Sequence, residues 1–265
     1  MMAKVHPTAI AGFNVAADDY AKSRPSYPTA ALDHIKSLIP DTDHAKILDL
    51  AAGTGIMTTL LDKVGYKHIT AVEPTKNMRE KLHALLPHVP VSDGTSWSIP
   101  LEDQSQDAVI VAQAFHWFAD VASLKEIHRV LKPNGFLILI WNMGSRERSR
   151  WVRLLRERYE QFDQNVPQYR KGLWKQCFDT KEAVELFELP FQSRMYDYDM
   201  TVHKDDVCRR AMTNSYVASL PEHVKEALYK ELEAIIHDPI NDFKPNADGY
   251  VIYPHDTEFV WMKKK

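Results

Sequence analysis

The chain has 265 residues, of which 45% are hydrophobic and 26% are charged, proportions typical of a globular protein with a sizeable core. Its net charge of −3 shows no basic half, which argues against nucleic acid as a partner, and no apolar run approaches the roughly 20 residues that span a bilayer. Two cysteines exclude a disulfide framework and suit a reducing compartment, so we expect a soluble, cytoplasmic protein.

The first half of the chain alternates between strand-like and helix-like segments. Five apolar runs are typical of buried strands, at residues 46–52, 68–74, 89–94, 107–115 and 136–142. Three segments between them have the apolar spacing of amphipathic helices, at residues 53–65, 75–87 (with Thr75 as a candidate N-cap) and 121–135. This alternation predicts a doubly wound α/β sheet of parallel strands.

The second half of the chain has a different character. Residues 145–190 are charged, aromatic and mostly helical, and residues 203–237 are typical of two helices separated by Pro221. Strands are predicted at 192–202 and at 250–264, and the second stretch could form a hairpin around its His-Asp pair. We therefore favour one sheet-based domain with an inserted helical cap over two independent domains.

A turn of small residues follows the first strand directly, in the sequence ILDLAAGTG. Gly53 and Gly55 lack the Cβ atoms that would keep a ligand away from the backbone N–H groups at the start of a helix. A dinucleotide site has a third glycine, as in G-x-G-x-x-G, where this chain has Thr58. Asp49, near the strand end, can hold an ammonium group or order the turn.

The second strand ends at Glu73, 18 residues after Gly55. An acid at this place can accept hydrogen bonds from both hydroxyls of a ribose. The combination predicts a nucleoside ligand with a charged amino-acid end and no required phosphate, a description that S-adenosylmethionine fits. A nicotinamide-dependent oxidoreductase and a non-catalytic, cofactor-binding regulatory protein are the alternatives.

Four stretches, DLAAGTG, VEP, GTSWSIPLEDQSQDAVIVAQAFHWF and EIHRVLKPNGFLILIWN, resemble class I S-adenosylmethionine-dependent methyltransferases. AADDYAKSRPSYP resembles the Y-x-x-x-R-P-x-Y-P segment of the small-molecule branch of methyltransferase type 11, which includes trans-aconitate methyltransferase-like proteins. The resemblance implies a Rossmann-like, seven-stranded sheet whose last strand is antiparallel. It also implies one domain over residues 1–265, with lid helices in 1–45 and a helical cap formed by about 145–190 and 203–240.

The resemblance further implies methyl transfer to a carboxylate, thiol, amine or hydroxyl of a small molecule, and it indicates the site. Cofactor contacts are expected from Tyr20, Arg24, Asp49, Ala51, Gly53, Gly55, Glu73, Pro74, Met78, Thr95, Ser96 and Gln113. Substrate contacts are expected from Tyr27, His116, Trp117, Trp141 and Trp174. Ala51 replaces the first turn glycine of the family, and Thr95 stands where many members carry an acid that meets the adenine amine, so Asp93 is an alternative for that contact.

His116 follows the fourth strand at the edge where ligands bind in open α/β sheets. A neutral imidazole there can take a proton from a hydroxyl, thiol or ammonium group, can contact the substrate, or can have a structural role alone. A carboxylate acceptor would need no base. No set of cysteines and histidines has the spacing of a metal site, and the sequence indicates neither the acceptor atom nor the oligomeric state.

Overall fold

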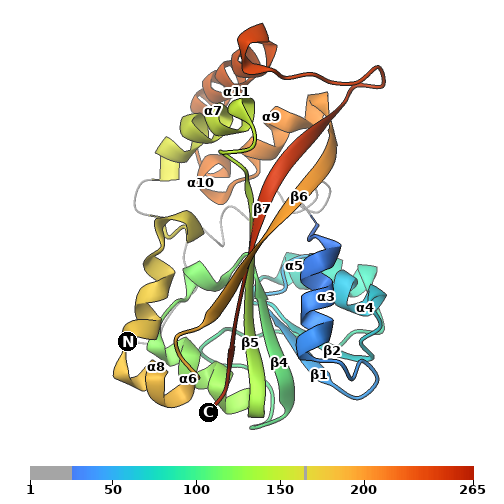
Figure 1. Cartoon of the computed structure of the whole chain (residues 1–265), viewed down its shortest axis with the longest axis vertical. Helices are drawn as coiled ribbons and strands as arrows, with labels where there is room; N and C mark the ends of the chain where they lie inside the picture. Colours follow the sequence, from blue (N-terminus) through green and yellow to red (C-terminus); the bar gives the residue numbers. More distant parts are fainter. Residues whose placement is uncertain (1–25, 164–165) are drawn as a thin grey trace.

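The computed structural model describes residues 26–163 and 166–265. Tyr20, Arg24 and most of the expected lid lie outside these residues. A seven-stranded sheet in the order β3-β2-β1-β4-β5-β7-β6 runs through the molecule (Figure 1). Its strands are β1 (Lys46–Leu50), β2 (His68–Val72), β3 (Val91–Ser92), β4 (Gln106–Ala112), β5 (Leu131–Gly144), β6 (Gln192–His203) and β7 (Tyr250–Lys263).

Strand directions confirm the predicted fold class. The strands from β3 to β5 pair in parallel, whereas β7 is antiparallel to both of its neighbours, β5 and β6. The hairpin considered within the last strand is absent from β7, which continues through His255 and Asp256. These two residues stand opposite Gly144 and Met143 of β5, so the sheet ladder already uses this stretch of backbone.

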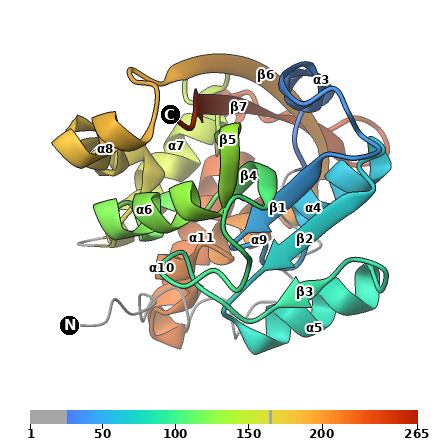
Figure 2. The ribbon, with the colours of Figure 1, turned by 90° about the horizontal axis from the view of Figure 1, so that it is seen from below.

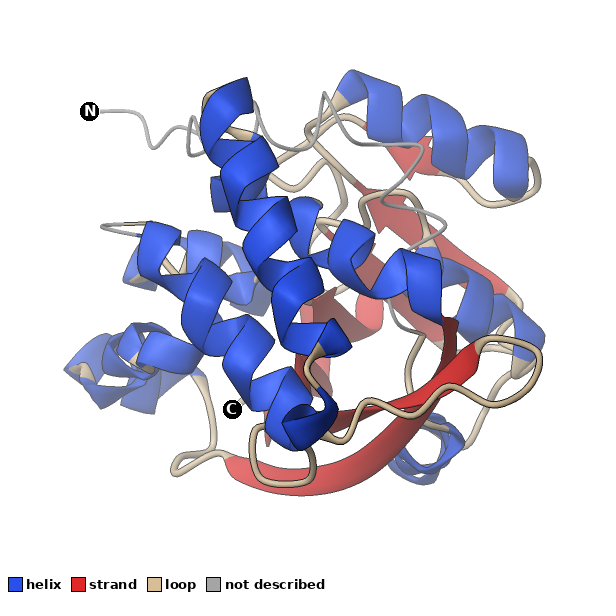
Figure 3. Cartoon of the chain, turned by 90° about the horizontal axis from the view of Figure 1, so that it is seen from above, coloured by secondary structure: helices blue, strands red, loops and turns tan. Residues whose placement is uncertain are grey.

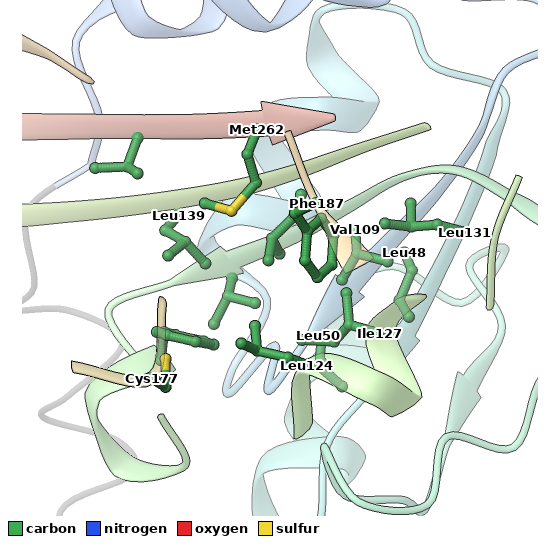
Figure 4. Close-up of a cluster of buried hydrophobic side chains, with 14 of the residues drawn as sticks. Leu48, Leu50, Val109, Leu124, Ile127, Leu131, Leu139, Cys177, Phe187 and Met262 are labelled. Carbon is green, nitrogen blue, oxygen red and sulfur yellow. The ribbon is translucent and has the colours of Figure 1, made fainter. Parts of the chain in front are cut away.

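Helices cover both faces of the sheet (Figure 2). The helices α3 (Thr29–Leu38), α4 (Ile56–Lys63) and α5 (Lys76–Leu85) pack on one face, and α6 (Val121–Val130) and α8 (Lys181–Leu186) pack on the other. Ile47 belongs to the first core and Leu48 to the second, because successive strand residues point to opposite faces. Figure 4 shows the second core, where Leu124 and Ile127 of α6 approach the sheet.

A further layer of helices stands at the far end of β6 and β7 (Figures 1 and 3). It contains α7 (Arg150–Tyr159), α9 (Lys204–Met212), α10 (Ser215–Ala218) and α11 (Glu222–His237). Its own core includes Leu155, Val207 and Leu232, packed with Val251 and Tyr253 from β7. Residues 203–237, where two helices are expected, contain three, namely α9, α10 and α11. Pro221 precedes α11, at the predicted break.

Two local expectations differ from the structure. The helix predicted over 121–135 is shorter in the structure, because α6 ends at Val130 and Leu131 already pairs with Gln106 of β4. Thr75 occupies the N-cap position of α5 without a capping side-chain bond. No helix within the described ranges combines the length and the apolar character that crossing a bilayer requires.

Candidate active site

A pocket of about 750 Å³, including the part open to solvent, lies at the C-terminal ends of β1, β2 and β4. This is the sheet edge at which open α/β folds bind ligands. Nine predicted residues line it: Ala51, Gly53, Glu73, Pro74, Met78, Thr95, Ser96, Gln113 and Trp117. The other lining residues are not indicated by the sequence motifs; they are Leu50, Thr75, Gly94, Trp97, Ala112, Ala114 and Phe118. Each of these is a direct sequence neighbour of a predicted residue.

Glu73 links the turn after β1 to the turn after β2 at the pocket wall. Its Oε2 accepts a hydrogen bond from the Gly53 N–H at 3.0 Å, and its Oε1 accepts one from the Thr75 N–H at 2.8 Å. The residue is only 4% exposed, and this burial raises the pKa of the carboxyl against the opposing effect of the hydrogen bonds. The Thr75 side chain also hydrogen-bonds to this carboxylate. A carboxylate offers about four lone-pair positions, so about one is left for a further donor such as a ligand hydroxyl.

The turn after β1 has an unusual backbone. Ala51, Gly53 and Gly55 all have positive φ, at 59°, 58° and 88°. A Cβ atom added at Gly53 would face the pocket wall, 3.8 Å from the Met78 sulfur, whereas one added at Gly55 would come within 2.8 Å of Leu82 Cγ. Gly55 does not line the pocket, so its lack of a side chain serves the packing of the turn on α5 rather than the approach of a ligand.

Asp49 lies behind the pocket and not on its wall. Its Oδ2 accepts a hydrogen bond from the Thr58 hydroxyl at 2.6 Å, which orders the start of α4. Burial raises the pKa of Asp49 to about 7 against the hydrogen bond from Thr58, and the charge of Glu73 adds to the rise. Among the described residues, Asp49 Oδ1 and the buried hydroxyl of Thr54 have no hydrogen-bond partner. The sequence left two roles open for this acid, and the contacts support the ordering of the turn.

The wall after β3 carries no acid. Asp93, the alternative to Thr95 for the adenine contact, is exposed, pairs with Arg79 at 3.1 Å and does not line the pocket. Thr95 and Ser96 line the pocket themselves, and the Ser96 hydroxyl accepts a hydrogen bond from the Ser123 hydroxyl at 2.9 Å. The polar groups available to a ligand on this wall are therefore hydroxyls and backbone.

The ends of β4 and β5 connect the pocket to the start of the described chain. Gln113 has a φ of 59°, and its side-chain N–H donates to the Asn142 carbonyl at 3.0 Å. The Asn142 side chain in turn donates to the Ser26 carbonyl at 2.6 Å and accepts from the Thr257 hydroxyl at 2.5 Å. This network holds Ser26 close to the pocket.

Of the five residues predicted to contact the substrate, only Trp117 lines the pocket. Tyr27 is 6% exposed and packs in the core under α3, and Trp141 and Trp174 are 0% and 2% exposed. The two tryptophan rings lie 4.6 Å apart in the core of the other face. Their aromatic character suggested a pocket wall, but the sequence does not distinguish this from a stacked core.

His116 lies in a short 3-10 turn, η1 (Phe115–Trp117), directly after β4. The pocket is lined by Ala114 on one side of it and by Trp117 on the other. His116 Nδ1 accepts a hydrogen bond from the Trp141 indole at 3.2 Å. His116 is therefore flanked in sequence by lining residues without lining the pocket itself, and its Nδ1 is bonded to the core.

Comparison with known proteins gives a consistent result. Residues 48–139 match the family model of a methyltransferase domain. Over 217 residues the chain is 33% identical to an uncharacterized methyltransferase-like protein of Schizosaccharomyces pombe, and the alignment covers 82% of each chain. Over 145 residues it is 44% identical to an uncharacterized methyltransferase of Mycobacterium tuberculosis, covering 55% of this chain and 57% of the relative.

A solved structure supports the fold. Phosphoethanolamine N-methyltransferase 2 of Haemonchus contortus, in complex with S-adenosyl-L-methionine, superposes with a TM-score of 0.55. The match covers 96% of this chain and 56% of that chain at 14% sequence identity. At this identity the likeness concerns the fold alone.

Proposed function

We propose that this chain, which belongs to the family of S-adenosylmethionine-dependent methyltransferases, transfers a methyl group to a small molecule. The observation that carries the proposal is the buried Glu73 carboxylate, which lines the pocket and is held by the Gly53 and Thr75 amides. A pocket with mostly apolar walls and a few convergent polar groups is typical of a cofactor or small-molecule site.

We assign the pocket walls to parts of the cofactor as follows. Glu73 accepts hydrogen bonds from the ribose hydroxyls, and the turn at Gly53 lets the amino-acid end approach the backbone. Thr95 and Ser96 offer hydroxyls to the adenine edge, and Met78 supplies an apolar contact for the ring. Tyr20 and Arg24, expected to close over the cofactor, lie outside the described residues.

S-adenosylmethionine supplies a methyl group on a positively charged sulfur. The chain has to align an acceptor lone pair with that group and to exclude water. Trp97, Trp117 and Phe118 line the pocket with aromatic surface, which excludes water and whose electron-rich ring faces favour a nearby cation. The Trp97 ring is fixed by a hydrogen bond from its indole to Asp120 Oδ2 at 2.9 Å.

The acceptor group is open among carboxylate, thiol, amine and hydroxyl. Cys177 and Cys208 are both buried free thiols, which agrees with our proposal that the protein works in the cytoplasm. The helices of the far layer, α7, α9, α10 and α11, remain our proposed cap over the substrate. Within the range 145–190, however, α8 packs on the sheet beside α6 and does not join that layer.

A screen of small acids, thiols, amines and phenols tests the proposal, with formation of S-adenosylhomocysteine as the readout. We expect turnover with a subset of one chemical class and none in a Gly53→Val variant. Cofactor binding without turnover across the whole panel would favour the non-catalytic alternative. Binding of NAD in place of S-adenosylmethionine would favour the oxidoreductase.

A further inference from the structure

We propose that helix α6 positions the pocket wall formed by the loop after β3, and thereby controls ligand affinity without touching the ligand. The loop, residues 94–101, contributes Gly94, Thr95, Ser96 and Trp97 to the pocket. Four side chains of α6 and its N-cap hold this loop, and we call them the polar row: Asp120, Ser123, Glu126 and Arg129. The polar row does not line the pocket itself. The identity of the ligand as S-adenosylmethionine rests on the proposed function, whereas the positioning of the loop does not.

The start of the helix holds two consecutive lining residues. Asp120 is the N-cap, and its Oδ1 accepts a hydrogen bond from the Ser123 N–H at 2.7 Å. Its Oδ2 accepts a second one from the Trp97 indole at 2.9 Å. The fully buried Ser123 hydroxyl donates to the Ser96 hydroxyl at 2.9 Å. Because an indole has a single N–H, and Asp120 accepts it, Trp97 offers a ligand apolar ring surface and no hydrogen bond.

The rest of the polar row binds the backbone of the loop. Glu126 Oε1 accepts a hydrogen bond from the Ile99 N–H at 2.8 Å. Arg129 donates from Nη2 to the Ile99 carbonyl at 2.9 Å and from Nη1 to the Leu101 carbonyl at 2.8 Å. Both polar groups of Ile99, two residues after Trp97, are therefore held by the same helix.

Glu126 and Arg129 also hold each other. Arg129 donates from Nε to Glu126 Oε2 at 2.9 Å and from Nη2 to Oε1 at 2.8 Å. These hydrogen bonds lower the pKa of the Glu126 carboxyl against the opposing effect of burial, so the pair is charged at neutral pH. A guanidinium can serve this carboxylate and two carbonyls together because its N–H groups form a planar fork, which a lysine lacks.

The spacing of the polar row allows one helix to serve the loop and the sheet together. Its members recur at every third position, and side chains three apart are neighbours on a helix surface. A second row lies directly beside it, formed by the buried residues Leu124, Ile127 and Val130 in the core against the sheet. This apolar row fixes the rotation of the helix, so the polar row keeps its direction toward the loop. The four side chains are thus positioning residues, which act through the pocket wall.

The start of the polar row can be tested by NMR of the ligand-free full chain labelled with ¹⁵N in its tryptophans. Asp120→Ser keeps a side chain that can cap the helix but removes the acceptor of the indole. The Trp97 indole signal is identified as the one missing from Trp97→Phe. We expect this signal to shift in Asp120→Ser and its hydrogen exchange to accelerate. Thr180→Ala, which removes the N-cap side chain of α8, should leave it unchanged. An unchanged Trp97 signal in folded Asp120→Ser would overturn the inference.

Calorimetry with S-adenosylhomocysteine shows whether Asp120 acts on the ligand through Trp97. We expect Asp120→Ser to weaken binding by about threefold or more in the wild-type background. In the Trp97→Phe background the same change should have no further effect, because phenylalanine has no N–H for Asp120 to hold. Equal losses of affinity in both backgrounds would overturn the indirect route.

The end of the polar row is tested at Arg129. Arg129→Ala removes its contacts with the loop, and Arg129→Lys is a milder variant that keeps the charge but not the fork. Lys132→Ala is the matched control, because it removes another partly exposed cation, which pairs with Asp107 at 2.7 Å and makes no such contact. We expect both Arg129 variants to shift the Trp97 indole signal and to weaken binding of S-adenosylhomocysteine, and Lys132→Ala to change neither.

A role in stability alone has a different signature. Lower thermal stability with an unchanged indole signal and unchanged affinity in both Arg129 variants would overturn the inference. A wild-type protein that does not bind S-adenosylhomocysteine would count against the proposed function instead. The indole signals of the ligand-free chain would then still decide whether the polar row fixes the wall.

Discussion

Glu73 is the residue on which cofactor affinity should depend most. We propose that it accepts hydrogen bonds from the ribose hydroxyls, and a hydrogen bond to a charged acceptor contributes roughly 1.5–3 kcal/mol. We expect Glu73→Ala to weaken binding of S-adenosylmethionine by at least about tenfold in calorimetry. Glu80→Ala, which changes an exposed acid on α5, is the control and should bind normally. Unchanged affinity in Glu73→Ala would remove this residue from the site.

Gly53 lies in the turn after β1, and Gly172 is a matched control position for a substitution there. Their φ angles are +58° and +70°, so a β-branched residue is strained at either position. Only at Gly53 would the new side chain also project to the pocket wall near Met78, because a Cβ at Gly172 meets nothing within 4 Å. We expect Gly53→Val to abolish cofactor binding and Gly172→Val to retain it. Similar affinities in the two folded variants would show that the turn does not approach the ligand.

Asp49 should make stability depend on pH. Its folded-state pKa of about 7 lies above the value of about 3.9 in an unfolded chain, so the native state keeps a proton that the unfolded state has released. Its contribution to the free energy of unfolding is therefore complete below about pH 4 and is lost as the pH rises to about 7. Asp49→Asn stays neutral, so its stability relative to wild type should increase over that range by at most about 1.4 kcal/mol per pH unit. Urea unfolding at several pH values measures this difference, and a constant difference would contradict the argument.

At the residue scale, the motif positions were predictable but the directions of the side chains were not. Glu73, Gly53 and Gln113 follow strand ends, and the sequence pattern located all three at the pocket. Asp49 precedes its strand end by one residue and points behind the wall that Leu50 lines, since neighbours on a strand face opposite ways. The contact between Trp141 and His116 joins residues 25 apart, and no local pattern indicates it.

At the element scale, the N-terminal segment gives the next prediction. Asn142 ties the Ser26 carbonyl to the end of β5, next to the Gln113 side chain of the pocket. We expect hydrogen exchange across residues 13–30 to slow when S-adenosylhomocysteine binds, as for elements that close over a ligand. Exchange in β5 provides the internal control. Equal rates with and without ligand would assign this segment a role in packing alone.

The elements themselves were predictable where one local pattern dominates. The continuous apolar runs of β1, β4 and β5 indicated strands buried on both faces, and the structure confirms them. The His-Asp pair inside β7 resembled a turn, but pairing with β5 and β6 on both sides keeps the strand continuous. The position of α8 beside α6 depends on burial of Ala183 and Phe187, a tertiary contact that sequence spacing does not specify.

At the scale of the whole molecule, β6 and β7 are the long elements that join the sheet to the far helical layer (Figure 1). The layer has a core of its own, which includes Trp151 and Tyr253 and is separate from the two cores that flank the sheet. Among the described residues, those that line the pocket fall within 50–118, inside the stretch 48–139 that matches the methyltransferase family model.

The most direct test of the account is calorimetric titration of the full chain with S-adenosylhomocysteine and, in parallel, with NAD. We predict that S-adenosylhomocysteine binds at one site per chain, that NAD does not bind, and that Gly53→Val abolishes the signal while Gly172→Val preserves it. Binding of NAD, or equal binding of S-adenosylhomocysteine by the wild-type and Gly53→Val proteins, would contradict the assignment of the pocket to the methyl donor.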